Sequence, residues 1–159
     1  MERNNLIQTI PILHKQWSLS VDIKPTGLVE GWSNVLHVGL GDDVGTYGDR
    51  SPGIWFASLD TRLHIPSAIN GNHNYYNYGD TPAIPMNEWT NVHVSQVQLS
   101  DGSYQFAIRV AGIIFHQMIN TNPMTLKNVY VYASDNFYPA SLARIDNFVI
   151  ETFPDDSTG

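Results

Sequence analysis

One stretch of regular alternation, residues 89–112, restricts the possible folds of this chain more than any other feature. Its sequence, WTNVHVSQVQLSDGSYQFAIRVAG, contains two runs in which apolar and polar side chains take turns. Successive side chains of a β-strand point to opposite faces, so these runs predict two half-buried strands. Gly102 lies between them and tolerates the positive φ of a tight turn. The stretch therefore predicts an antiparallel hairpin with Val92, Val94 and Val97 on one face.

The same alternation predicts further strands on both sides of this hairpin. They are expected at residues 17–24, 32–40, 54–57, 62–65, 113–115, 129–133 and 143–152. Short strands separated by turn residues, without a clear helix or an internal repeat, predict an all-β sandwich or barrel. We expect one domain over residues 1–159, with a core at about 14–153 and a polar tail at 154–159.

Composition excludes several classes of function. Only 14% of the residues are charged, against about 25% in an average domain, and the net charge is −7 with 8 Lys and Arg. Nucleic-acid binding needs clustered cations and is not expected. There is no cysteine, which excludes disulfides, Cys-ligated zinc and thiol catalysis. No apolar run predicts membrane insertion, and no signal-peptide pattern opens the chain, so we expect a mature or excised extracellular domain.

Several segments, taken in order, resemble one known fold family. They are QWSLSVDIKP at 16–25, SNVLHVG at 33–39, PGIWFASLDTRLHI at 52–65, PMNEWTNVHVSQ at 85–96 and ARIDNFVIE at 143–151. Together they are similar to the strands of laminin-G-like and concanavalin-A-like domains. The resemblance implies an all-β jelly-roll sandwich of two antiparallel sheets. It leaves function open, because this fold carries lectins, glycanases and adhesion modules alike.

The residues that catalysis would need are missing from the sequence. Glycoside hydrolysis uses two carboxylates that flank the scissile bond. The Glu-x-Asp-x-x-Glu pattern of the sandwich glucanases does not occur, and the glutamates are isolated at Glu2, Glu30, Glu88 and Glu151. The histidines form neither an H-x-H nor an H-E-x-x-H pair, which makes a zinc site unexpected. We therefore predict that the protein is not an enzyme.

An acidic loop suggests a calcium site, on the strength of the resemblance. Laminin-G-like domains bind a calcium ion at the rim through an Asp that follows a Gly, and Asp49 follows Gly48 here. The partner ligands would come from the turn with Asn120 and Asn122, because hard cations prefer oxygen ligands. Arg50 departs from the family pattern. The alternatives are an Asp49–Arg50 turn or a solvated acidic loop.

A second loop suggests sugar binding. Sugar recognition combines planar amides, which bind hydroxyl groups, with aromatic rings, which stack on C–H faces. Residues 70–79 read NGNHNYYNYG and offer both, although such a loop can equally be a turn-rich connector. The candidate ligand-binding residues are Asp42, Asp43, Asn70, Asn72, Asn74, Tyr75, Tyr76 and Tyr78. We assign Trp32, Trp55, Phe137 and Tyr138 to core or rim packing.

These observations favour a non-catalytic extracellular recognition module that binds carbohydrate. Calcium at the rim site would assist this binding. The alternative is a structural or adhesion domain of a larger matrix or cell-surface protein. Such a domain would bind a protein partner or form a homo-oligomer. Missing catalytic pairs and low charge support both readings.

Overall fold

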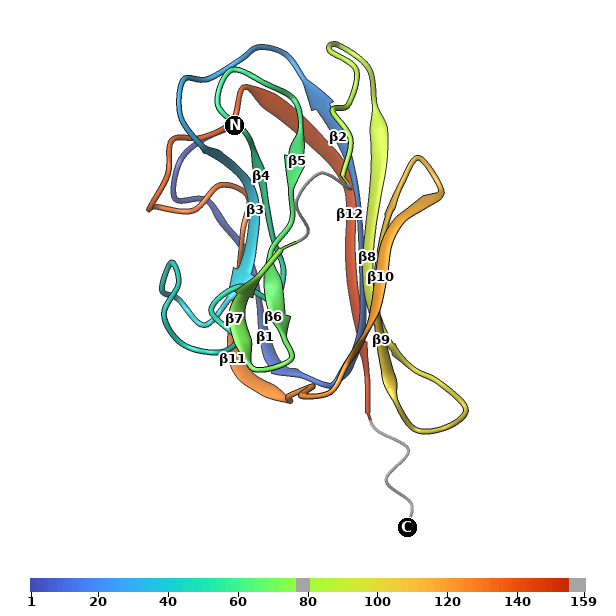
Figure 1. Ribbon diagram of the computed structural model, residues 1–159. Coiled ribbons are helices and arrows are strands. Elements are labelled where there is room, and N and C mark those ends of the chain that lie inside the picture. Colours follow the sequence, from blue (N-terminus) through green and yellow to red (C-terminus); the bar gives the residue numbers. More distant parts are fainter. Residues whose placement is uncertain (77–80, 155–159) are drawn as a thin grey trace.

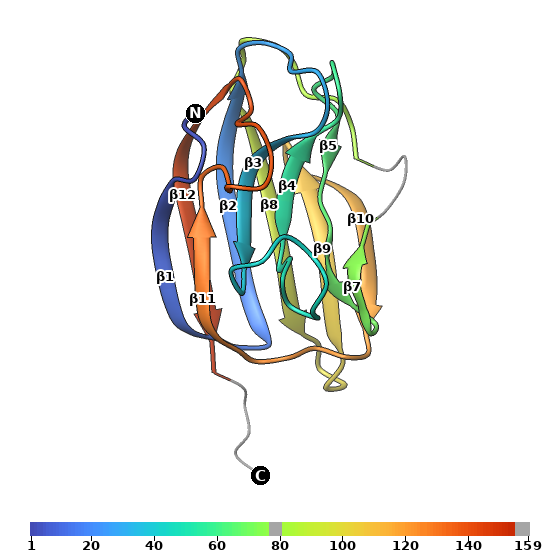
Figure 2. The same ribbon diagram turned by 90° about the vertical axis from the view of Figure 1, so that its left-hand side faces the viewer.

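Two antiparallel sheets face each other across a common core (Figures 1 and 2). The computed structural model describes residues 1–76 and 81–154, and these contain twelve strands and no helix. The front sheet, which faces the viewer in Figure 2, has the order β1 (Leu6–Leu13), β11 (Leu126–Tyr132), β3 (Ser33–Gly39), β4 (Gly53–Phe56) and β5 (Leu63–His64). The back sheet has the order β10 (Ile113–Asn120), β9 (Tyr104–Val110), β8 (Thr90–Gln98), β2 (Gln16–Pro25) and β12 (Ala143–Phe153).

Alternation along each strand builds the core. In β2 the side chains of Trp17, Leu19, Val21 and Ile23 are at most 5% exposed, whereas the residues between them are half-buried. Burying one face of each sheet against the other is the main stabilising contribution in such a sandwich. The predicted all-β, two-sheet antiparallel architecture is confirmed. Among the described residues, no helix is long and apolar enough to cross a membrane.

The predicted hairpin is present as β8 and β9, and β8 is the middle strand of the back sheet. Gly102 has a φ of 89° in the turn between them. One detail of the prediction is wrong: Val97 does not share the buried face of Val92 and Val94. The strand keeps its period of two, so Gln96 points inward and Val97 is 37% exposed.

The polar segment 67–75, which overlaps the candidate sugar-binding loop, contains a hairpin of its own. It consists of β6 (Ser67–Ile69) and β7 (Asn72–Tyr75). Asn70 and Gly71 form the turn with φ values of 55° and 78°. Asn-Gly is the residue pair that such a turn prefers, so the signal was in the sequence.

The N-terminal strand also belongs to the sandwich. A proline inside an apolar run predicts an edge strand or a connector for the residues before 14. In agreement with this, β1 pairs with β11 at the edge of the front sheet. Both Ile10 and Leu13 are buried, so the core begins before residue 14. Pro11 lies in this edge strand, where its missing N–H costs no sheet hydrogen bond.

Candidate functional site

The outer face of the front sheet carries an aromatic cluster centred on Trp55. Its neighbours in β4, Ile54 and Phe56, point into the core, so Trp55 must point outward. Its indole lies across Gly53, where an added Cβ would come within 2.0 Å of the ring. Trp55 is nevertheless only 1% exposed. Loops from distant parts of the chain therefore cover it.

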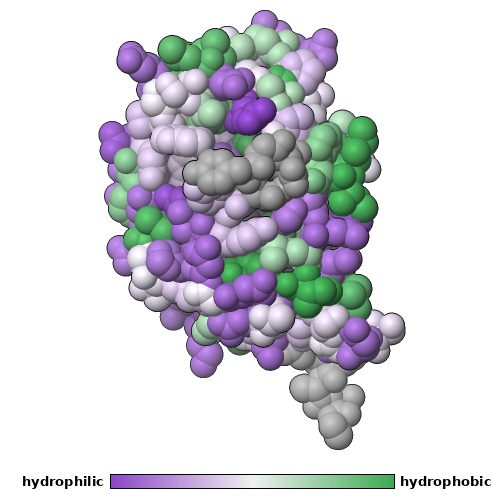
Figure 3. Space-filling view, in the orientation of Figure 1, coloured by the Kyte–Doolittle hydropathy of each residue, from purple (hydrophilic) through white to green (hydrophobic). Residues whose placement is uncertain are grey.

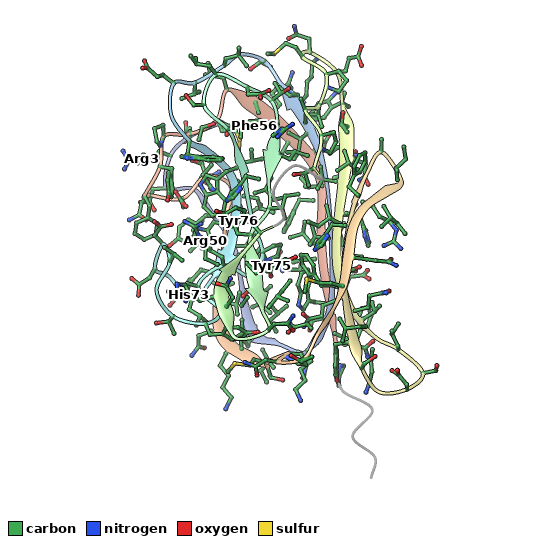
Figure 4. The ribbon with its side chains drawn as sticks, in the orientation of Figure 1. Arg3, Arg50, Phe56, His73, Tyr75 and Tyr76 are labelled. Carbon is green, nitrogen blue, oxygen red and sulfur yellow. The ribbon has the colours of Figure 1, made fainter. Side chains whose placement is uncertain are left out.

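These loops leave a cleft of about 250 Å³ beside Trp55. The lining residues come from the front sheet, from β7 and from four connecting segments. They are Trp32, Arg50, Trp55, His64, Asn74, Tyr76 and Tyr138. Figure 4 shows Arg50 and Tyr76 together on the outer side of the front sheet. The cleft thus gathers side chains from positions 32 to 138 of the chain.

One wall of the cleft is a row of three aromatic rings that are tilted relative to one another. The His64 ring lies between Trp32, at a centroid distance of 4.7 Å, and Tyr76, at 4.6 Å. His64 itself is paired across the strands with Trp55. Trp32 remains 45% exposed. The wall therefore presents an accessible aromatic surface at the mouth of the cleft.

A polar network centred on Arg50 forms the opposite side. Its Nη2 donates to Asp43 Oδ1 over 2.6 Å and to the Tyr138 hydroxyl over 3.1 Å, and that hydroxyl donates to Asp43 Oδ2. Its Nη1 donates to Asn74 Oδ1 over 2.9 Å. The guanidinium carbon lies 4.3 Å from the ring centre of Trp55, within range of a cation–π interaction. Arg50 is therefore held rigidly, with 5% of its surface exposed.

A buried pair below the cleft joins the loops that carry Arg50 and Tyr138. His37 Nδ1 lies 2.8 Å from Asp135 Oδ2, and His37 Nε2 lies 2.7 Å from the backbone oxygen of Asp49. The other Asp135 oxygen accepts the backbone N–H groups of residues 137 and 138. The His37–Asp135 pair therefore fixes the backbone at Asp49, next to Arg50, and at Tyr138. In this way it positions both loops of the Arg50 network.

Burial keeps two titratable groups of the cleft uncharged near neutral pH. The pKa of His64 is lowered to about 4, first by burial and then by the positive charge of Arg50. The pKa of the Tyr138 hydroxyl is raised, first by burial and then by the negative charge of Asp43. His64 is therefore a neutral imidazole and Tyr138 a neutral phenol at physiological pH.

The structure brings some of the predicted ligand-binding residues together. Asn74 and Tyr76 line the cleft, and Asp43 contacts it through Arg50 and Tyr138. Asp42 is exposed and lines a separate, narrow groove beside Phe137.

The other predicted residues of the 70–78 loop lie elsewhere. Asn70 is a turn residue whose Oδ1 accepts from the backbone and hydroxyl of Thr121, and Asn72 accepts from the backbone of residue 74. Tyr75 points toward the sandwich interior (Figure 4), where it packs on the core and contacts His116. Tyr78 falls outside the described residues.

The predicted calcium ligands lie in two loops that do meet. The Tyr47 hydroxyl donates to the backbone oxygen of Asn122 over 2.6 Å. However, Asp49 Oδ2 accepts the backbone N–H of Thr46, and Asn120 Oδ1 accepts those of residues 70 and 122. These oxygens already accept hydrogen bonds from the backbone, and the described residues contain no cluster of three His, Asp or Glu. Arg50 pairs with Asp43 and not with Asp49. Calcium binding therefore stays a prediction.

Sequence reasoning missed the centre of the cleft. We had assigned Trp32, Trp55 and Tyr138 to packing, and had given Arg50 and His64 no binding role. Phe137 is 40% exposed and lines the neighbouring groove. The usable signal was Trp55 itself: it lies between two core residues of a strand, so alternation places a large aromatic ring on the outer face.

Comparisons with known proteins define the fold. No family model matches the chain, and no curated protein is similar to it. Among solved structures, a heptameric SAP-like pentraxin from Limulus polyphemus aligns over 91% of this chain and 67% of its own, with a TM-score of 0.61 and 13% identity. The carbohydrate binding module CBM66 from Bacillus subtilis aligns over 95% of this chain and 84% of its own, with a TM-score of 0.52 and 11% identity. An endo-β-1,4-glucuronan lyase from Trichoderma reesei aligns over 94% of this chain and 72% of its own, with a TM-score of 0.55 and 14% identity.

The chain therefore has the concanavalin-A-like jelly-roll fold of lectins and glucanases, as the sequence resemblance predicted. A closer likeness to laminin-G domains is not shown. Matches at such low sequence identity show the fold and not the function. The three matched structures include both a binding module and a lyase. The side chains of the cleft must therefore carry the argument on function.

Proposed function

We propose that this chain is a non-catalytic, extracellular, lectin-like module that binds carbohydrate in the cleft on the front sheet. The observation that carries the proposal is the row of three rings, Trp32, His64 and Tyr76, beside the polar network of Arg50 and Asn74. Trp32, at the end of this row, is 45% exposed. A sugar ring has apolar C–H faces and a rim of hydroxyl groups. Aromatic rings beside fixed polar groups match both features.

Two observations favour binding over catalysis. The carboxylate beside the cleft, Asp43, is already paired with Arg50, whereas glycoside hydrolysis needs two carboxylates free to act. A catalytic base should have a pKa close to the working pH, yet the pKa of Tyr138 is raised. The similarity to a carbohydrate binding module agrees with this choice.

A matched pair of tryptophan variants tests the proposal. Trp32 and Trp89 are 45% and 46% exposed, but only Trp32 lines the cleft. We expect Trp32→Ala to weaken binding to the best ligand on a glycan array by about fivefold, because one lost aromatic contact is worth about 1 kcal/mol. Trp89→Ala should bind like the wild type, and both variants should keep its melting temperature.

The array should be run with calcium and with chelator. Binding that needs calcium would support the rim site at Asp49, and equal binding would leave the module calcium-independent. If no glycan binds under either condition, or if both tryptophan variants bind alike, the cleft is not a sugar site.

One observation favours the adhesion alternative. A shallow apolar groove of about 380 Å³ runs between the segment 82–91 and the strands β9 and β10. Its lining includes Trp89, Ile113 and Phe115. Figure 3 shows hydrophobic colour along the side of the molecule formed by the β9–β10 hairpin. An exposed apolar edge of this kind suits a second copy of the chain.

A further inference from the structure

We infer that the cleft selects an uncharged sugar ring and rejects the same ring carrying a carboxylate. This inference rests on the proposed function and names the class of its ligand. The volume of about 250 Å³ lies below the range of about 300–1,000 Å³ for drug-sized ligands, so a single ring is the unit that fits. Whether the cleft accepts a charged or an uncharged ring depends on Arg50.

The positive charge of Arg50 is neutralised within the protein. Its guanidinium is 2.6 Å from the carboxylate of Asp43, and 5% of the residue is exposed. A ligand carboxylate would meet Asp43 as well as Arg50, and the two charges cancel at that distance. The other titratable groups that face the cleft, His64 and Tyr138, add no positive charge near neutral pH.

The hydrogen bonds that Arg50 already donates also argue against binding of a carboxylate. A guanidinium has five N–H groups. Nε donates to the Asp43 backbone oxygen, Nη2 to Asp43 Oδ1 and the Tyr138 hydroxyl, and Nη1 to Asn74 Oδ1. One N–H, on Nη1, is left. Strong capture of a carboxylate by arginine uses two parallel N–H groups, and Arg50 has no such pair to offer.

The remaining donors of the lining suit hydroxyl or ring oxygens. Within the described residues, Nε1 of Trp55 is buried without a hydrogen-bond partner, which is costly unless a ligand supplies an acceptor. The side-chain amide of Asn74 is held by its oxygen, so its nitrogen is directed to other acceptors. These are neutral donors, and each is satisfied by an uncharged oxygen.

The test compares sugars that differ only in charge. Methyl glucoside and methyl galactoside are titrated against methyl glucuronide and methyl galacturonide by saturation-transfer NMR and calorimetry. We expect the wild type to bind at least one neutral glycoside at least tenfold tighter than its uronide. Asp43→Asn removes the internal counter-charge of Arg50 and should shift this ratio toward the uronide by at least fivefold.

Glu30→Gln is the control, because it removes the same charge from an exposed residue near Trp32 without unpairing Arg50. It should keep the wild-type ratio. A wild type that prefers uronides overturns the inference and leaves sugar binding standing. A wild type that binds neither class overturns both. If Asp43→Asn and Glu30→Gln shift the ratio equally, the Arg50–Asp43 pair does not select the ligand.

Discussion

Trp55 combines three properties that only its surroundings explain. It has the outward direction of a surface residue, the burial of a core residue, and an indole N–H without a partner. Its ring is accommodated because Gly53, two residues earlier on the same strand face, has no side chain. Arg50 then covers the ring. A large aromatic residue on the outer face of a sheet is thus the base on which the cleft is built.

His64 should make the stability of the protein depend on pH in a defined window. Its pKa is about 4 in the folded chain and about 6.5 in the unfolded chain, so the unfolded chain binds more protons between these values. The free energy of unfolding should have its full value above pH 6.5. It should fall as the pH drops toward 4, by on the order of 2 kcal/mol after allowance for solvent screening.

Urea unfolding at several pH values measures this effect. His64→Phe keeps a ring between Trp32 and Tyr76 but cannot take up a proton. The loss of stability between pH 6.5 and 4 should be smaller in this variant than in the wild type. Identical pH profiles would show that His64 is not the group responsible.

At the scale of elements, the strands that stabilise the fold are not those that carry the cleft. The hairpin β8–β9 lies in the back sheet, and its inward residues belong to the core. The cleft lies on the outer face of the front sheet, which points away from the core. Fold and binding should therefore respond to different substitutions.

Two valines of β8 provide a matched test of this separation. Val94 is fully buried and Val97 is 37% exposed. Val94→Ala should lower the free energy of unfolding by about 2 kcal/mol, because it removes two methyl groups and leaves a cavity. Val97→Ala should change it by less than about 0.5 kcal/mol. Chemical denaturation measures both, and equal effects would contradict the assigned register.

At the scale of the whole molecule, the sandwich joins distant segments. Strand β1 pairs with β11, and β12 pairs with β2. The first and last strands of the chain are therefore edge strands, one in each sheet. The same arrangement places β10 and β12 at opposite edges of the back sheet. Each edge exposes apolar residues, Ile113 at 60% and Val149 at 50%.

The adhesion alternative predicts self-association through the β10 edge. Sedimentation over a range of concentrations should then show a dimer that Ile113→Asp removes. Val149→Asp, on the opposite edge, should leave the dimer intact. A monomer at all concentrations would reject self-association, and equal loss in both variants would place the interface elsewhere.

Much of the fold could be predicted from local pattern, whereas little of the cleft could. Alternation in residues 17–24 and 90–110 predicts strands because burial of one face needs a period of two. Asn74 and Tyr76 were predicted as binding residues because of their side-chain chemistry. Arg50 and Trp32 were not, because their roles depend on Asp43 and His64, which are neighbours in space and not on one strand.

The sequence by itself determined the class of fold, the position of most strands and the shortage of catalytic pairs, because these follow from the period of hydrophobic residues and from composition. The tertiary structure decided which polar and aromatic residues meet. Arg50, Trp55 and Tyr138 converge only when loops from both halves of the chain are brought over the front sheet. Long-range packing sets those distances, and no local spacing encodes them.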